Sequence, residues 1–230
     1  MSNAYPLVFA VGSLGGLLSL LAPGRGPRRR GADAGDDARP AVVDAGWIAL
    51  LAGLLGARLA YVAAHAAYFI AHPAEAPAFW LGGLSWAGGA LGAWLGLVGA
   101  ARFLRQDGWA LADRLILPAA GQSGAAWLGC LLDGWAYGVP TGEAWGAVPA
   151  AGLLETSVPR WPTQWAGICA SLATLALLMW LAPRLQRTGL LASLGMILIS
   201  AVCLGLSFVR ADPVPMVYGL RLEMLGSAAI

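Results

Sequence analysis

The chain has 230 residues, of which 59% are hydrophobic and only 11% are charged, with a net charge of +2. A soluble globular domain carries about 25% charged residues, so the composition excludes an ordinary soluble protein and predicts an integral membrane protein. The small net charge gives no reason to expect nucleic acid as a partner, and three scattered cysteines indicate neither a disulfide framework nor a metal site.

Six apolar segments approach or reach the roughly 20 residues that a membrane-spanning helix needs. In chain order they are residues 5–21, 46–68, 82–104, 111–132, 163–181 and 189–209. They predict a single membrane domain with an all-α fold, a polytopic bundle of about six transmembrane helices. No basic region precedes the first segment, so we expect a spanning helix there rather than a cleaved signal peptide.

Arginine sets the expected orientation, because cytoplasmic loops carry an excess of positive charge. The loop at 22–45 is interpreted as a solvated, arginine-rich cytoplasmic loop. The third and fourth segments, and the fifth and sixth, are also joined by arginine-bearing connections. The opposite loops, 69–81 and 133–162, contain a single arginine, Arg160. We therefore expect both termini on the extracytoplasmic side.

The same topology places several charged, polar and glycine residues at the outer ends of the segments. Arg58 lies about 18 Å along the second segment at 1.5 Å per residue. A charge at that depth indicates a functional site, unless the side chain extends back to the headgroups. We expect an outer-leaflet cleft lined by Tyr5, Arg58, Tyr61, Ser85, Gly88, Gly89, residues 126–138, Arg160, Gln164 and Arg210.

Four short motifs stand at these positions. They read G-A-R-L-A-Y-V at 56–62, L-S-W-A-G-G at 84–89, R-W-P-T-Q at 160–164 and F-V-R-A-D at 208–212. In this order they resemble motifs of the bacterial prolipoprotein diacylglyceryl transferases, namely G-[AG]-R-[LI]-G-Y-V, M-S-[FIW]-H-G-G, R-H-P-[ST]-Q and E-F-F-R-x-x-D. Tyr5 stands where that family has a first-helix tyrosine.

This resemblance implies a multi-pass protein of the bacterial cytoplasmic (inner) membrane. It also implies an activity, which is transfer of a diacylglyceryl group from phosphatidylglycerol to the cysteine thiol of a lipoprotein precursor. Members of the family usually continue into a seventh helix. The tail at 216–230 is too short to span, so we expect a flank of the bundle that a lipid or a partner subunit would cover.

The stretch 126–138, A-W-L-G-C-L-L-D-G-W-A-Y-G, resembles the family signature G-R-x-G-N-[FY]-x-N-x-E-x-[WY]-G in altered form. Gly129, Tyr137 and Gly138 match the signature. Its arginine, two asparagines and glutamate are replaced by Trp127, Cys130, Asp133 and Trp135. Elsewhere the resemblance implies two histidines, an arginine and an acidic residue at positions occupied by Ala87 or Trp86, Trp161, Cys203 and Ser207.

These replacements matter because diacylglyceryl transfer needs a cation for the phosphate of the leaving group and a base near the thiol. Trp127 and Cys203 cannot supply the cation, and neither Ala87 nor Trp86 can supply the base. His65 and His72 lie outside the family's motif positions and are interpreted as loop or interface residues. No catalytic residue, metal ligand or cofactor is assigned.

Two hypotheses from different classes remain. In the first, the chain is a catalytically degenerate family member, a pseudoenzyme that binds a phosphatidylglycerol-like phospholipid or serves as a structural subunit beside other integral membrane proteins. In the alternative, it is a divergent active transferase that uses Arg58, Arg160 or Arg210 with another base. A small transporter or channel would need more polar groups at mid-depth than this sequence offers.

Overall fold

The computed structural model describes residues 4–21, 38–79, 82–143, 146, 158–212, 216–217 and 220–229. These residues confirm the all-α fold. Their only strands are two antiparallel strands of two residues each, which pair with one another. The elements are α1 (Ala4–Ser19), α2 (Ala38–Ala64), α3 (Ala66–Ala71), the 3-10 turn η1 (Pro73–Glu75), α4 (Trp86–Phe103), α5 (Gly108–Asp133), α6 (Thr163–Leu181), α7 (Leu190–Ser207), β1 (Met216–Val217), β2 (Leu220–Arg221) and α8 (Leu222–Ala229).

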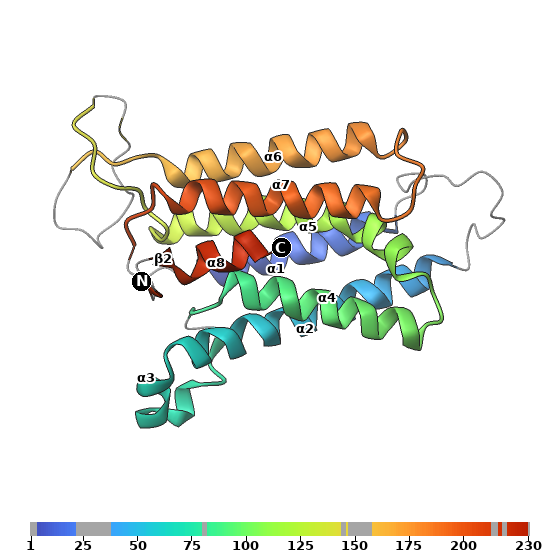
Figure 1. Ribbon diagram of the computed structural model, residues 1–230, viewed down its shortest axis with the longest axis horizontal. Helices are drawn as coiled ribbons and strands as arrows, with labels where there is room; N and C mark the ends of the chain where they lie inside the picture. Colours follow the sequence, from blue (N-terminus) through green and yellow to red (C-terminus); the bar gives the residue numbers. More distant parts are fainter. Residues whose placement is uncertain are drawn as a thin grey trace.

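All six apolar segments contain a long helix. Four helices have the length and composition to cross a membrane, namely α5, α6, α7 and the Pro40–Ala64 part of α2, and α1 is shorter but also apolar. Successive long helices run in alternate directions, so the ends expected outside gather at one end of the molecule. The two described arginine-bearing connections, α4–α5 and α6–α7, lie together at the other end (Figure 1). The side of the membrane that each end faces stays a prediction.

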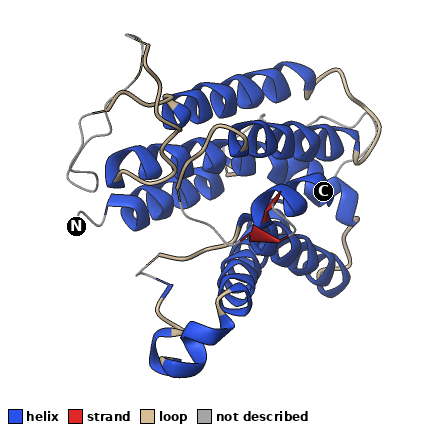
Figure 2. Ribbon diagram, turned by 60° about the vertical axis from the view of Figure 1, so that its left-hand side comes forward, coloured by secondary structure: helices blue, strands red, loops and turns tan. Residues whose placement is uncertain are grey.

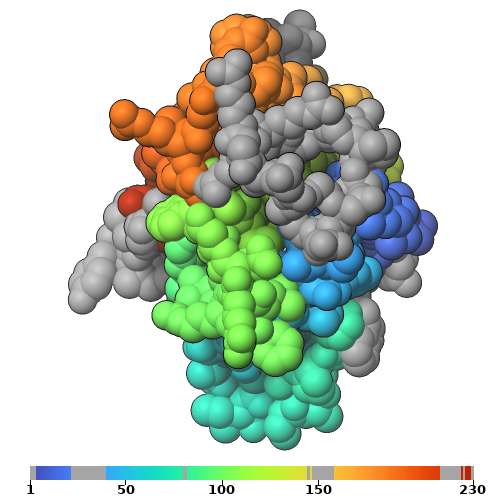
Figure 3. All heavy atoms as spheres, turned by 90° about the vertical axis from the view of Figure 1, so that its right-hand side faces the viewer, coloured from blue at the N-terminus to red at the C-terminus, as the bar shows by residue number. Residues whose placement is uncertain are grey.

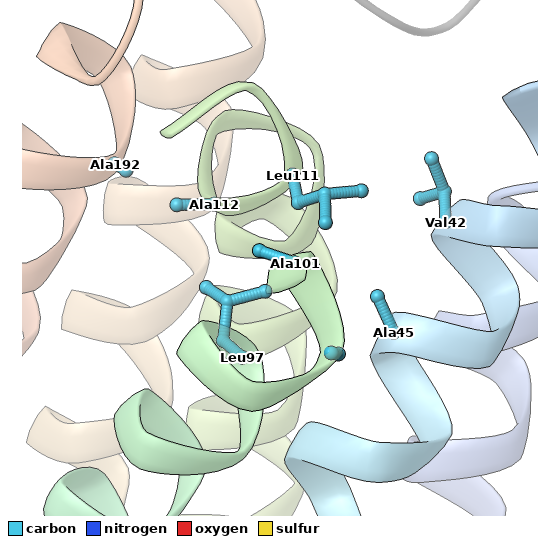
Figure 4. Packing of buried hydrophobic residues seen from close by; sticks show 8 residues of the cluster. Val42, Ala45, Leu97, Ala101, Leu111, Ala112 and Ala192 are labelled. Atoms are coloured by element: carbon cyan, nitrogen blue, oxygen red, sulfur yellow. The ribbon is translucent and has the colours of Figure 1, made fainter. Parts of the chain in front are cut away.

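The boundaries of the second segment differ from the sequence prediction at both ends. Residues 38–45, which the sequence placed in the arginine-rich loop, form the first turns of α2. Val42 and Ala45 are buried there against α4 and α5 (Figure 4), and this burial extends the helix toward Pro40, a residue suited to a first turn. Residues 22–37 lie outside the described part of the chain. At the other end, α2 stops at Ala64 and the short α3 follows.

Glycine allows α2 and α4 to cross at very short range. A Cβ atom on Gly88 would lie 2.5 Å from the carbonyl oxygen of Gly56, and one on Gly56 would lie 2.9 Å from the Cα of Gly92. Any larger side chain at these positions would push the two helices apart. The close packing of small residues that lipid favours is therefore concentrated in this pair.

Two aspartates at opposite ends of α5 cap the first turns of other helices. The Asp113 carboxylate accepts hydrogen bonds from the backbone N–H groups of Gly189, at 2.7 Å, and Ala192, at 2.9 Å, where α7 begins. The Asp133 carboxylate accepts from the N–H groups of Ala4 and Tyr5, at 3.2 and 2.9 Å, where α1 begins. Because the first N–H groups of a helix have no partner within it, α5 ties α7 and α1 in place.

The last described residues fold onto the bundle. After the strand pair (red in Figure 2), α8 packs against α7 and α4, and Gly226 lies directly against Ala87. Whether a lipid or a partner subunit covers a flank of the bundle stays a prediction.

Candidate functional site

Three of the sequence motifs meet in an irregular ladder, which we call the motif ladder. It consists of residues 137–141, 159–161 and 209–211. Gly138 forms an antiparallel bridge with Arg210, and Pro140 forms one with Arg160. Residues 137–141 therefore form the central segment, which pairs with 209–211 on one side and with 159–161 on the other. Four backbone hydrogen bonds of 2.8–3.0 Å join the three segments. This pairing brings the altered signature beside the two later motifs.

The first turn of α6 holds the loop between α5 and the ladder. The hydroxyl of Thr163 donates to the carbonyl of Ala136 at 2.6 Å, and the amide of Gln164 donates to the carbonyl of Trp135 at 2.9 Å. Both donors are buried, and Ala136 has a positive φ of 55°. Gln164, a candidate for headgroup binding, therefore helps to hold an unusual turn. The side chain of Trp135 is half exposed beside it.

Arg160 retains hydrogen-bonding capacity. Its Nη1 donates to the carbonyl of Gly138 at 3.2 Å, and the guanidinium carbon lies 5.0 Å from the centroid of the Tyr137 ring. Its Nε is buried and has no hydrogen-bond partner within the described part of the chain. An arginine has five N–H donors, so this side chain can still bind an anion.

Arg210 is already paired with a carboxylate. Its Nε and Nη2 donate to the two oxygens of Asp212 at 2.9 and 2.6 Å, in the two-pronged geometry that arginine and carboxylate favour. Both side chains are mostly buried, at 15% and 11% exposure. The guanidinium carbon also lies 6.0 Å from the centroid of the Trp127 ring.

Trp127 occupies the space between α5 and α6 beside Arg210. Its side chain is 7% exposed. A Cβ atom on Gly167 of α6 would lie 2.6 Å from Cγ of the indole, so the ring sits directly on that glycine. The resemblance places an arginine at this position, and the structure places a buried apolar ring there.

The remaining signature residues hold α1. The ring of Tyr5 packs against Gly129, where a Cβ atom would lie 2.7 Å from Cδ2 of the ring. Asp133 caps the same helix through the N–H of Tyr5, and Cys130 is half-buried on the turn between Gly129 and Asp133. This part of the signature joins two helices.

Arg58, another predicted site residue, lies on α2, away from the motif ladder. It is 8% exposed and donates four hydrogen bonds to backbone carbonyls of the loop at 75–83. The acceptors are Ala76 at 2.7 Å, Gly82 at 2.6 Å, Gly83 at 3.1 Å and Glu75 at 2.6 Å. The side chain therefore holds this loop instead of extending to the lipid headgroups. Few of its N–H donors remain for a ligand.

Aromatic rings complete the surroundings of Arg58. Its guanidinium carbon lies 5.7 Å from the Tyr61 ring and 5.3 Å from the Phe69 ring. Further out on α3, the Tyr68 hydroxyl donates to Glu75 at 2.8 Å, and this hydrogen bond raises the pKa of the phenol.

The histidines lie on the same projecting part of the molecule. Nδ1 of His65 and Nδ1 of His72 lie 2.9 and 3.2 Å from the carbonyl oxygens of Tyr61 and Tyr68. Each imidazole also packs against the ring of the same tyrosine.

The glycine motif at the start of α4 serves helix packing. The Ser85 hydroxyl accepts from the N–H of Gly88 at 3.4 Å and caps α4, while the Ser85 N–H donates to the carbonyl of Ala57 at 3.0 Å. Gly88 and Gly89 face α2. Trp86 packs against an apolar cluster of α5, α6 and α7, and its indole N–H is buried without a partner among the described residues.

Two contributors were not singled out from the sequence. Asp212 belongs to the last motif, where its spacing of two from Arg210 was a usable signal. Gly167 carries no local signal, because its importance comes from Trp127, a residue on another helix.

Comparisons with known proteins give a family for the whole chain. The family model for prolipoprotein diacylglyceryl transferase matches residues 3–230. The phosphatidylglycerol–prolipoprotein diacylglyceryl transferase of Cupriavidus pinatubonensis is 33% identical over 142 residues, which is 58% of this chain and 48% of the relative. The proteins of the same name from Nitrosomonas europaea and Geobacter sulfurreducens are 32% and 38% identical over 140 and 114 residues, covering 60% and 48% of this chain and 49% and 42% of the relatives. The chain spans about half the length of the curated relatives it matches.

Proposed function

The chain belongs to the prolipoprotein diacylglyceryl transferase family, and we propose that it binds an anionic phospholipid headgroup at Arg160 without transferring the diacylglyceryl group. Members of this family are bacterial inner-membrane proteins, which agrees with the spanning helices found here. The lipid we propose is phosphatidylglycerol or one of similar charge.

The observation that carries the proposal is the position of Trp127. Its buried ring sits on Gly167 at the place where the family signature has an arginine. A neutral indole cannot stabilise the charge that develops on a phosphate leaving group. Arg210, the nearest guanidinium to the ring among the described residues, is bound to Asp212.

The two histidines that the resemblance implies are also absent from their motif positions. Trp86 and Trp161 each offer an N–H donor and no base. Trp86 is partly buried and packs against apolar side chains, and Trp161, in the motif ladder, is partly exposed. A lipoprotein thiol placed at these positions would meet no group that removes its proton.

Arg160 supports the binding half of the proposal. Of the three candidate arginines, Arg58 is bonded to four carbonyls and Arg210 to a carboxylate, whereas Arg160 keeps a buried donor without a partner in the described chain. A phosphate beside Tyr137 would accept from Nη2, which forms no hydrogen bond with the described residues, and would neutralise the charge. As a lipid-holding protein, the chain would act as a structural subunit beside other membrane proteins.

Photo-crosslinking tests the binding site. Phosphatidylglycerol with a photoreactive headgroup would be added to the purified protein in nanodiscs of neutral lipid, and crosslinked peptides would be mapped by mass spectrometry. We expect crosslinks at residues 137–141 and 159–161, reduced about tenfold or more by Arg160→Gln, because charge-assisted hydrogen bonds contribute about 1.5–3 kcal/mol. The matched control is Arg184→Gln, which removes an exposed arginine near the opposite end. Equal labelling of the Arg160→Gln variant would overturn the assignment.

A further inference from the structure

A second apolar site lies at the opposite end of the bundle from the motif ladder. It is a pocket of about 80 Å³ lined by Trp94, Leu97 and Val98 of α4 and by Gly108 and Trp109 of α5. The two indole rings lie 5.2 Å apart at an angle of 54°, and both are partly exposed. No sequence motif or proposed function of the chain uses this pocket.

Contacts from three directions hold Trp109 in place. The turn before α7 packs behind it, since a Cβ atom on Gly189 would lie 2.9 Å from Cε3 of the indole. The Asp107 carboxylate accepts from the backbone N–H of Trp109 at 3.0 Å and fixes the first turn of α5. Trp94 contacts the ring from α4. The pocket is therefore built into the packing of three helices.

Three exposed arginines lie on the helix and turns that form the pocket. Arg102 follows Val98 by one helical turn and lies on the same side of α4. Arg105 lies in the turn between α4 and α5, and Arg187 lies in the turn that contacts Trp109. All three are exposed and form no ion pair with any described residue. Figure 3 views this end, where the α4–α5 turn (green) and the α6–α7 turn (orange) lie together.

Two nearby carboxylates cap helix N-termini. The carboxylates of Asp107 and Asp113 accept hydrogen bonds from backbone N–H groups at the starts of α5 and α7. Each is thus directed at a helix N-terminus, whose positive end it balances. The three arginines outnumber these two carboxylates, which leaves an excess of positive charge at this end of the bundle.

We propose that this pocket holds part of an acyl chain of an anionic phospholipid whose phosphate is bound by Arg102, Arg105 and Arg187. A soluble anion would make no use of the apolar lining, and a neutral lipid would make no use of the arginines. The volume is far below the roughly 300–1,000 Å³ of pockets that enclose compact ligands, so it suits a segment of a flexible chain. The site is independent of Arg160, because the two lie at opposite ends of the bundle.

Fluorescence quenching by brominated lipid tests this site. The protein, carrying Arg160→Gln to remove the other proposed site, would be placed in neutral nanodiscs containing phosphatidylglycerol brominated on its acyl chains. The part of the quenching lost in Trp94→Phe and Trp109→Phe variants reports lipid in the pocket. We expect this part to be saturable and specific for the anionic lipid.

Replacing Arg102, Arg105 and Arg187 together with glutamine should weaken the apparent affinity at least tenfold, since each arginine near an anionic lipid contributes about a fivefold factor. The matching triple lysine variant keeps the charge and should retain most of the binding. Val98→Phe fills the pocket without adding an indole and should abolish the saturable part of the quenching while leaving the three arginines in place. The proposal is wrong if the triple glutamine variant binds like the parent, if neutral brominated lipid quenches equally, or if folded Val98→Phe binds undiminished.

Discussion

Trp127 and Gly167 form one packing unit, in which a large ring on α5 needs a glycine on α6. The resemblance to the family signature implies that Trp127 replaces an arginine, but it does not show what the indole contacts. The structure adds that the indole is buried and that it lies beside Arg210. The altered signature is thus packed as an apolar contact between helices.

Gly167→Ala should destabilise the protein by about 1–3 kcal/mol, because the added methyl group would overlap the Trp127 ring and force repacking. Thermal unfolding in detergent would measure the loss. Gly99→Ala serves as the control, since a Cβ atom there meets no other group within 4 Å, and alanine is the better helix former. Equal melting temperatures for Gly167→Ala and the parent would contradict this packing.

Arg58→Lys should loosen the loop at 75–83. A lysine ammonium is a point charge with three donors, and it cannot reproduce the flat guanidinium that reaches four carbonyls. Hydrogen exchange measured by mass spectrometry should become at least tenfold faster in peptides covering the loop. Labelling by photoreactive phosphatidylglycerol at the motif ladder should not change. Arg102→Lys is the control for the charge-preserving replacement, and unchanged exchange in the Arg58 variant would refute its holding role.

At the scale of elements, the contacts that fix the helices join residues far apart in the chain. Asp113 and Asp133 connect α5 to the first turns of α7 and α1. Gly56 and Gly88 set the distance between α2 and α4. Each of these contacts fixes the position of a whole helix.

Asp113→Ala should cost about 1–2 kcal/mol, because two N–H groups at the start of α7 would lose their acceptor in a buried place. The measurement is thermal unfolding, together with hydrogen exchange of residues 189–192. Asp107→Ala provides a comparison, since that exposed carboxylate caps its own helix and should cost less. A stability equal to that of the parent would show that water or another group replaces the Asp113 carboxylate.

Neighbouring glycines give a matched pair for the α2–α4 crossing. Gly88→Ala places a methyl group 2.5 Å from the carbonyl oxygen of Gly56, whereas Gly89→Ala places one 3.4 Å from Cβ of Ala57. We expect the first to lower the melting temperature markedly and the second to change it little. If both variants melt together, the helices do not cross as closely as described here.

The sequence predicted the elements well and their contacts poorly. Long apolar runs located all six helical segments, because apolar length is the main requirement for crossing a bilayer. The early start of α2 at Ala38 was missed, since it depends on burial of Val42 and Ala45 against other helices. For the same reason, the motifs identified Arg58 and Arg210 as candidate headgroup-binding residues. They did not identify the backbone carbonyls and the carboxylate to which these arginines donate hydrogen bonds.

In the molecule as a whole, the alternating directions of the helices determine which residues lie at each end of the bundle. One end carries the motif ladder with Arg160, and the other carries the tryptophan pocket and three exposed arginines. Between the two ends, α8 packs against α7 and α4. The chain is a family member with an all-helical frame, and we propose that it binds anionic lipid and has an apolar contact in place of the catalytic cation.

A transfer assay tests this account most directly. The purified protein would be incubated with phosphatidylglycerol and a synthetic lipoprotein-precursor peptide containing the acceptor cysteine, and mass spectrometry would follow addition of a diacylglyceryl group to the thiol. A relative named as the transferase serves as the positive control under the same conditions. We predict headgroup crosslinks at the motif ladder and no modified peptide. Thioether product that forms with the parent protein and is lost in Arg160→Gln or Arg58→Ala would contradict the account and identify an active transferase.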